Sequence, residues 1–270
     1  MTEATTNGNR VGIAELELRA VCKQFGGLHA LEDVSFSVAK GKISGLIGPN
    51  GAGKTTLFNI ITGVLPATSG EIRFRDQDIT KMPPHRITKL GMARTFQNIR
   101  LFSSMTVMES IFVAQNVRAG TGIGTLIPLN RNKEKKYKHQ REKYLNQFSL
   151  WEKRHYRCRD LSYADQRRME MARALATEPS LLLLDEPSAG MNETETAECC
   201  QLIRDLNAEG LAILLIEHDM SVVMGCSDQI TVLNFGKKIA GGTAAEIQSD
   251  PDVIEAYLGK EDSVEEYAEA

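Results

Sequence analysis

The stretch Gly48-Pro49-Asn50-Gly51-Ala52-Gly53-Lys54-Thr55 decides the fold of this chain. It matches the pattern G-x-x-x-x-G-K-[ST] at every defining position, and in that pattern backbone N–H groups surround phosphate oxygens. The lysine reaches the outer phosphates of a nucleotide, and the hydroxyl that follows it meets Mg²⁺. We therefore predict a phosphate-binding loop for ATP with Mg²⁺, made of Gly48, Pro49, Asn50, Gly51, Ala52, Gly53, Lys54, Thr55 and Thr56.

The residues on either side of the loop agree with this interpretation. The mostly apolar run Ile43–Ile47 reads as a buried strand, and Leu57, Phe58, Ile60 and Ile61 recur at helical spacing after the loop. A strand, a glycine-rich loop and a helix form the context that the motif requires, because the helix N-terminus then points at the phosphates.

Length and composition indicate a globular protein. The chain has 270 residues, of which 42% are hydrophobic and 25% charged, and its net charge of −3 provides no basic field for nucleic acid. No apolar run approaches the roughly 18–20 residues that cross a bilayer, and Met1–Arg10 has no signal-peptide core. We expect the chain to stay in the cytoplasm unless a partner holds it at a membrane. The five cysteines form no C-x-x-C pair, which favours free buried thiols.

The pattern along the chain predicts an α/β fold. Strands at 15–21, 31–38 and 71–74 indicate an antiparallel layer, and the region 106–176 is mostly helical. Two very apolar runs, at 181–184 and 211–216, predict central parallel strands buried on both faces. A hairpin at 230–240 and two short helices at 244–248 and 251–258 follow. We expect one domain over residues 13–260, with a disordered lead-in at 1–12 and an acidic tail at 261–270.

A basic segment, Arg131–Lys143, holds seven basic and two acidic residues. A nucleic-acid patch is conceivable there, but a solvated helix face is the better interpretation, because no aromatic residues are interleaved and no second basic patch accompanies it.

Polar side chains follow the two central strands at the point where each strand ends. Asp185-Glu186 comes after the first run, and Glu217-His218 comes after the second. Parallel sheets bind ligands beyond the carboxyl ends of their strands, so these side chains should meet Lys54 and Thr55. Asp185 is then the candidate for the metal, and Glu186 is the candidate base that activates water. His218 could contact the γ-phosphate or could be a turn histidine.

With these motifs in this order, the chain resembles the ATPase subunits of ATP-binding-cassette (ABC) transporters from about Leu16 to Leu258. The stretch Leu161–Arg168 resembles the family signature and is followed by its expected helix, Leu181–Pro187 resembles Walker B, and Ser188–Met191 lies where the D-loop belongs. The resemblance implies that Gln97 contacts the metal and the reaction site, that His218 is the switch histidine, and that Phe25 stacks on adenine. It also places Ser162, Ala164 and Asp165 against a nucleotide.

Within that family the chain is most similar to subunits that serve branched-chain or neutral amino-acid uptake. The similarity rests on Arg94–Phe102, Ile216–Met220 and Pro251–Gly259, and the insertion Ala119–Lys136 also suits that group. ATPases for urea uptake or lipopolysaccharide export share much of this pattern. A soluble cassette ATPase that is not part of a transporter is a further alternative, although such proteins usually carry two cassettes or a coiled coil.

The resemblance implies a P-loop NTPase (RecA-like) core with an antiparallel β layer and an inserted helical subdomain at about 98–176. It implies a head-to-tail dimer of two cassettes, in which each ATP lies between one P-loop and the other subunit's signature. Two transmembrane permease subunits would receive the motion at the cytoplasmic face of the inner membrane. A periplasmic or extracellular solute-binding protein would take part indirectly, and no nucleic acid is implied.

Two signature residues depart from the family pattern. Ala164 stands where glycine is usual, and a methyl group costs little there if φ is negative but about 1 kcal/mol or more if φ is positive. Asp165 stands where glutamine is usual, and a carboxylate beside a triphosphate is repulsive unless it points away or caps a helix. The second cassette can be a different subunit or a second copy of this chain; from the altered signature we expect an asymmetric heterodimer with one less competent site.

Overall fold

The computed structural model describes residues 14–115 and 131–258 and contains two β-sheets. The antiparallel sheet has the order β2-β1-β4-β5, with β1 at Ala14–Phe25, β2 at Leu28–Ala39, β4 at Ser69–Phe74 and β5 at Gln77–Asp78. The first two strands are longer than the sequence predicted, because the turn between them takes only Gly26 and Gly27.

The second sheet has the order β10-β9-β3-β8-β7-β6. Its strands are β3 Ile43–Ile47, β6 Met92–Arg94, β7 Leu181–Asp185, β8 Ala212–Ile216, β9 Gln229–Asn234 and β10 Lys237–Gly242. All neighbouring pairs are parallel except β9 and β10, which form a hairpin. The predicted central parallel strands are therefore confirmed.

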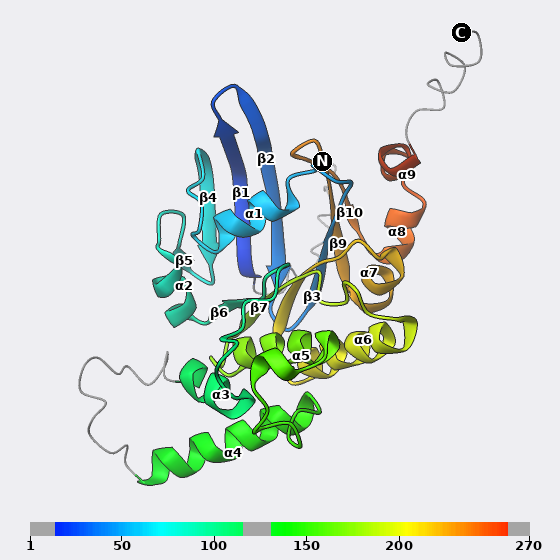
Figure 1. Ribbon diagram of the computed structural model, residues 1–270. Helices are drawn as coiled ribbons and strands as arrows, with labels where there is room; N and C mark the ends of the chain where they lie inside the picture. The colour runs from blue at the N-terminus through cyan, green and yellow to red at the C-terminus, as the bar shows by residue number, and fades with distance from the viewer. Residues whose placement is uncertain (1–13, 116–130, 259–270) are drawn as a thin grey trace, which may run out of the picture.

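The described helices connect and cover these sheets (Figure 1). They are α1 Lys54–Ile61, α2 Pro84–Leu90, α3 Val107–Gln115, α4 Arg131–Gln147, α5 Tyr163–Leu175, α6 Glu193–Ala208, α7 Met220–Cys226, α8 Ala244–Gln248 and α9 Pro251–Leu258, with a short 3₁₀ turn at Cys158–Asp160. Helices α3, α4 and α5 follow β6 and precede β7 in the chain. Whether the helical subdomain is bounded at about 98 and 176 stays a prediction.

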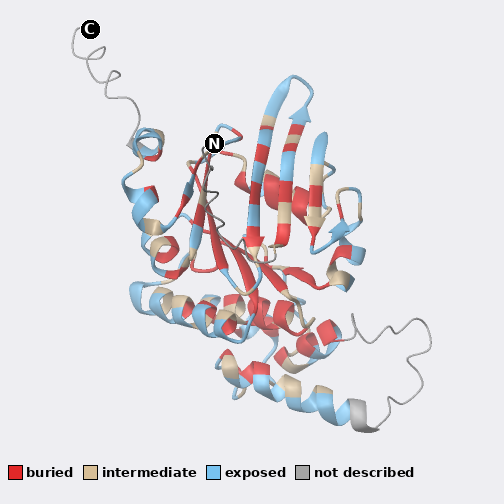
Figure 2. Cartoon of the chain, turned by 180° about the vertical axis from the view of Figure 1, so that it is seen from behind, coloured by how far each residue is buried: buried red, intermediate tan, exposed pale blue. Residues whose placement is uncertain are grey.

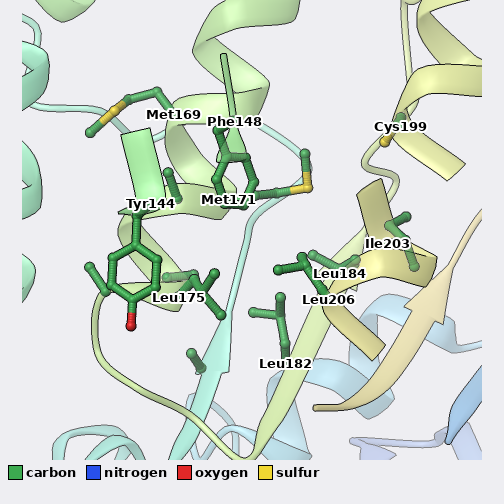
Figure 3. Packing of buried hydrophobic residues seen from close by; sticks show 14 of the residues in the cluster. Tyr144, Phe148, Met169, Met171, Leu175, Leu182, Leu184, Cys199, Ile203 and Leu206 are labelled. Carbon is green, nitrogen blue, oxygen red and sulfur yellow. The ribbon is translucent and has the colours of Figure 1, made fainter. Parts of the chain in front are cut away.

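The alternation of side chains along β7 divides the interior into two cores. Leu181 and Leu183 pack with α1 and the antiparallel sheet, whereas Leu182 and Leu184 pack on the other face against the helical layer. Figure 3 shows this second core, in which the two leucines face Met171 and side chains of α6. Because both faces of the sheet are covered there, β3, β7 and β8 are buried along their whole length (Figure 2), which explains their mostly apolar sequences.

The basic segment forms the first part of α4. Its described lysines, such as Lys135 and Lys138, are exposed, while Leu145 near the end of the helix and Phe148 just after it are buried. This is the solvated helix face that the sequence favoured. The cysteines are free thiols, with Cys158, Cys199 and Cys226 buried and the other two half-buried. Among the described residues no helix is long and apolar enough to span a bilayer. The predicted lead-in and acidic tail lie outside the described residues.

Candidate nucleotide site

Four parallel strands bring the predicted motifs to one edge of the sheet. β3 ends at the glycine-rich loop, β7 ends at Asp185, and β8 ends just before Glu217 and His218. β6 ends at Arg94 and leads through Thr95 to Gln97. The sequence predicted site residues at the ends of β3, β7 and β8, and the structure adds those that follow β6.

A cleft of about 490 Å³ opens at this edge. It is lined by predicted site residues Phe25, Asn50, Gly51, Ala52, Gly53, Lys54, Thr55, Thr56, Gln97, Glu186 and His218, together with Leu28, His29, Ala30, Phe235 and Gly236. The remaining predicted residues, Gly48, Pro49, Asp185, Ser162, Ala164 and Asp165, do not line it.

The loop meets the physical requirements of a phosphate site. Helix α1 begins after Gly53, which has φ 98°, and its first turn has neither a side-chain cap nor an acidic residue. The first N–H groups and the positive end of the helix dipole are thus left for an anion. Lys54 is 6% exposed, and its ammonium donates to the carbonyls of Gly48 and Pro49. Burial lowers the pKa of Lys54, while Glu186 and Asp185 oppose that effect.

The start of the loop is packed against the neighbouring strand. A Cβ on Gly48 would lie 2.1 Å from the carbonyl oxygen of Leu233 in β9, at φ 150°. No side chain fits that space, so this glycine is required by contact within the protein rather than by the ligand. The loop and the end of β9 are therefore held together.

Glu186 lies at the centre of the polar side chains. Its Oε1 is 2.7 Å from Nε2 of His218, and its Oε2 accepts a hydrogen bond of 3.0 Å from the Gln97 amide. Its φ of 52° is unusual for a residue other than glycine, and such backbone strain is typical of functional sites. The structure thus brings together the three residues that we predicted to act on the reaction.

Glu217 forms hydrogen bonds to the segments that follow Glu186 and that carry His218. Its Oε1 accepts bonds from the N–H (2.8 Å) and the hydroxyl (2.6 Å) of Ser188, and its Oε2 accepts from the N–H of His218. Burial raises the pKa of Glu217, although these hydrogen bonds act against the rise. The turn after Glu186 and the turn that carries His218 are therefore tied to each other.

Asp185 is engaged inside the protein. Its side chain is 2% exposed, and its Oδ2 accepts a 2.8 Å bond from Arg94, whose side chain is 7% exposed. The same guanidinium donates to Asn59 at 2.8 Å and to Thr62 at 3.2 Å in and after α1. Arg94 was missed by sequence reasoning; the only signal was a charged residue within a short apolar segment.

The signature residues lie at the start of α5. Ser162 is the N-cap, and its hydroxyl accepts from the N–H of Asp165. Ala164 lies in the first helical turn without a positive φ, so its methyl group causes no backbone strain. The Asp165 carboxylate points into the protein, where it meets Lys153 and the Ser162 hydroxyl and is 4% exposed. From the sequence we expected repulsion between this carboxylate and a triphosphate unless the carboxylate points away or caps a helix. Because it points into the protein, that repulsion is relieved.

Helix α5 also holds the segment that carries Gln97. Arg167 donates to the carbonyls of Phe96 (3.0 Å) and Gln97 (2.6 Å). Glu170 accepts from the N–H groups of Phe96 and Arg100. Burial raises the pKa of Glu170. These contacts join residues about 70 positions apart in sequence, so no local pattern could have predicted them.

This fold and this site define a P-loop ATPase: a nucleotide-phosphate loop, a strand-end acidic pair and a histidine on a parallel sheet. Comparison with known proteins gives the particular group. The family model described as "ABC transporter" matches residues 31–189, and the one described as "Branched-chain amino acid ATP-binding cassette transporter" matches residues 237–263. The chain belongs to the ABC transporter family, as one of its ATP-binding cassettes.

Individual relatives agree. The chain is 44% identical over 249 residues to the high-affinity branched-chain amino acid transport ATP-binding protein LivG of Salmonella typhimurium, covering 91% of this chain and 98% of that protein. It is 42% identical to the corresponding protein BraF of Pseudomonas aeruginosa, with the same coverage. A solved nucleotide-free cassette from an ABC transporter has a TM-score of 0.79 and 32% identity, covering 92% of this chain and 100% of that one. A cassette in its ADP conformation has a TM-score of 0.78 and 32% identity, covering 92% and 99%.

Proposed function

We propose that this chain is the ATP-hydrolysing subunit that powers uptake of branched-chain or neutral amino acids through separate permease subunits. The observation that carries the proposal is the arrangement of Glu186, His218 and Gln97 beside the phosphate loop. Relatives named for branched-chain amino acid transport match almost their whole length. Urea uptake, lipopolysaccharide export and a soluble cassette remain the alternatives that the sequence left open.

The residues present fit ATP with Mg²⁺. The uncapped start of α1 and the Lys54 ammonium would hold the phosphates, and exposed Thr55 offers a hydroxyl. The side-chain amide nitrogen of Gln97 donates to Glu186, so the side-chain oxygen of Gln97 is left for the metal. Because Asp185 is buried and bonded to Arg94, we propose that it would support the metal site through this ion pair rather than hold the metal directly. When bound, Mg²⁺ would neutralise charge on the phosphates.

Glu186 is the group that would accept a proton from the attacking water. His218 and Gln97 each engage one of its oxygens, so the carboxylate is held in one orientation. Orientation of a base within hydrogen-bond reach of its water is what general-base catalysis requires. Phe25 lies in the same cleft at the end of β1, 45% exposed, with the Lys23 ammonium 4.8 Å from its ring centre. We assign it to the base of the nucleotide.

The chain would work as one of two cassettes. Ser162, Ala164 and Asp165 lie apart from the cleft, and we propose that they face the nucleotide held by a second cassette. Exposed Phe102 and Phe112 lie on the helical side of the molecule, where we place the permease contact. This contact would hold the chain at the cytoplasmic face of the membrane, and a solute-binding protein outside would deliver the amino acid.

Ala164 is unstrained and Asp165 faces inward, so neither strain nor repulsion supports the asymmetric heterodimer. Its only support is that these two residues differ from the usual family signature. Ala164→Gly in the assembled transporter tests it. The heterodimer proposal expects a higher ATPase rate or tighter ATP binding, and an unchanged rate and affinity would remove its basis.

The decisive experiment combines purification with one substitution. Extraction of the chain from native membranes in mild detergent should recover two permease subunits and a second cassette, and the purified complex should hydrolyse ATP faster when the amino acid and its binding protein are added. Glu186→Gln should reduce hydrolysis by at least a hundredfold while ATP still binds. Recovery with ribosomes, or full activity of Glu186→Gln, would contradict the proposal.

A further inference from the structure

The tip of the β9–β10 hairpin has an unexpected residue. Asn234 pairs with Lys237, so the connection consists of Phe235 and Gly236 alone, with φ values of 42° and 78°. Two-residue hairpin turns with positive φ at both positions favour Asn-Gly, because left-handed backbone is disfavoured for bulky side chains. The backbone at this position therefore selects against phenylalanine.

Packing does not account for the residue either. The Phe235 side chain is 85% exposed, the highest value among the large exposed hydrophobic residues that the structure describes. A phenylalanine that is strained in its backbone and exposed at its ring stabilises the fold very little. Strained positions of this kind cluster at functional sites.

The position of the tip indicates that function. β9 is the parallel neighbour of β3, so Phe235 follows the end of β9 as the phosphate loop follows the end of β3. The N–H of Gly236 donates to the Ala52 carbonyl at 3.1 Å, and the Gly236 carbonyl accepts from Glu32 at 2.8 Å. The tip is thus fastened both to the phosphate loop and to the β1–β2 hairpin that carries Phe25.

Three exposed apolar side chains line this cleft. Phe25 (45% exposed), Leu28 (68%) and Phe235 (85%) all line the cavity that contains Lys54. They come from two separate hairpins, and both hairpins adjoin the phosphate loop. Clustered exposed apolar side chains on a monomer mark a binding site.

We propose that Phe235 is a second aromatic contact for the base of the bound nucleotide, in addition to Phe25. The inference rests on the nucleotide-binding function proposed above. The occupant is the base of the nucleotide, since the phosphates of the same ligand would lie on the adjoining loop. Aromatic stacking is tolerant of base identity, so Phe235 contributes affinity for adenine and guanine nucleotides alike.

The test compares two probes on the purified chain: ADP, which has a base, and tripolyphosphate, which has none. Phe235→Ala should weaken ADP binding roughly tenfold, in the range that loss of base stacking produces, and should leave tripolyphosphate binding within about twofold. Phe235→Asn should weaken ADP binding equally while raising the melting temperature, because asparagine tolerates positive φ. Tyr156→Ala, which removes another exposed aromatic ring, should change neither affinity.

The outcomes separate the two claims. If the parent chain fails to bind ADP, the nucleotide-binding function itself is wrong. If the parent binds ADP and both Phe235 variants bind it within twofold of the parent, the role of Phe235 is overturned. Equal losses for ADP and tripolyphosphate would also overturn it, because they would mean that the phosphate loop had been disturbed. A change in self-association without a change in ADP affinity would assign the ring to a second copy of the chain and contradict the proposal.

Discussion

Arg94 and Asp185 form a buried ion pair, with 2.8 Å between the guanidinium and Oδ2 and side chains that are 7% and 2% exposed. Arg94 also meets the end of α1 and lies 5.0 Å from the ring centre of Phe96. One side chain thus connects the helix after the phosphate loop, the acidic end of β7 and the segment that carries Gln97.

Replacing Arg94 with methionine should destabilise the protein severely. The change leaves the Asp185 carboxylate buried without its cation, which costs about 3–5 kcal/mol. Urea unfolding measures the loss. Arg19→Met provides the matched control, because its pairs with Glu17 and Glu71 are exposed and should be worth at most about 1 kcal/mol. If both variants lost the same free energy of unfolding, burial would not be what makes the Arg94–Asp185 pair important for stability.

Replacing Arg167 with alanine should loosen the segment that carries Gln97. The guanidinium makes two hydrogen bonds to backbone carbonyls there, and a hydrogen bond to a charged group is worth about 1.5–3 kcal/mol. Amide hydrogen exchange over residues 96–100 should speed up at least tenfold. Arg168→Ala, one residue along, should leave this exchange unchanged, since Arg168 bonds Glu198 instead. Similar exchange in both variants would refute the assignment.

Replacing Glu170 with glutamine should change how stability depends on pH. Burial raises the folded-state pKa of Glu170 above its ordinary 4.5, so the folded state binds this proton more tightly. The resulting stabilisation is full below about pH 4.5 and is lost as the pH rises through the folded-state pKa. Glutamine cannot ionise. The variant should therefore gain stability relative to the parent as pH increases, by at most about 1.4 kcal/mol per pH unit.

Urea unfolding at pH 5, 6 and 7 measures this difference. Glutamine keeps an oxygen for the N–H groups of Phe96 and Arg100. Its amide nitrogen replaces Oε2, which makes no hydrogen bond but lies 3.8 Å from the Arg167 guanidinium. A flat difference for Glu170→Gln across this pH range would contradict the raised pKa of Glu170 in the folded protein.

The adjacent thiols of Cys199 and Cys200 should differ in reactivity. Burial raises the pKa of Cys199 to about 12, whereas a hydrogen bond with the Cys226 thiol lowers the pKa of half-buried Cys200. The thiolate is the reactive form. Brief treatment of the native protein with iodoacetamide at pH 7.5, followed by peptide mapping, should find Cys200 alkylated ahead of Cys199. Unfolding in urea should abolish the difference, and equal labelling of the native protein would contradict it.

The sequence predicted those features that local pattern determines. The apolar runs that became β3, β7 and β8 are long enough to show burial on both faces, and each is followed by site residues. β5 and β6, with two and three residues, are too short to have a period, and we made no prediction for them. The helices α2 and α7, of seven residues each, were also not predicted.

Other site features depend on the folded chain. The only sign of Arg94 in the sequence is a charged residue within a short apolar segment, which is weak because arginine is usually exposed. Its partner is 91 residues away, so only the parallel pairing of β6 with β7 brings the two together. Phe235 belongs to a hairpin that the sequence did predict, but its place at the cleft follows from the pairing of β9 with β3.

Phe96, Gln97 and Arg100 are hydrogen-bonded to α5. A displacement of α5 relative to the sheet would therefore displace Gln97 as well. Thr95 bonds the Leu183 carbonyl and so belongs to the sheet, whereas Phe96 bonds α5 through both of its peptide groups. The chain therefore passes from hydrogen bonds with the sheet to hydrogen bonds with α5 within a single peptide link. A tilt of the helical layer relative to the sheet would change the distance from Gln97 to Glu186. The hydrogen bond between these two side chains would therefore depend on the position of α5.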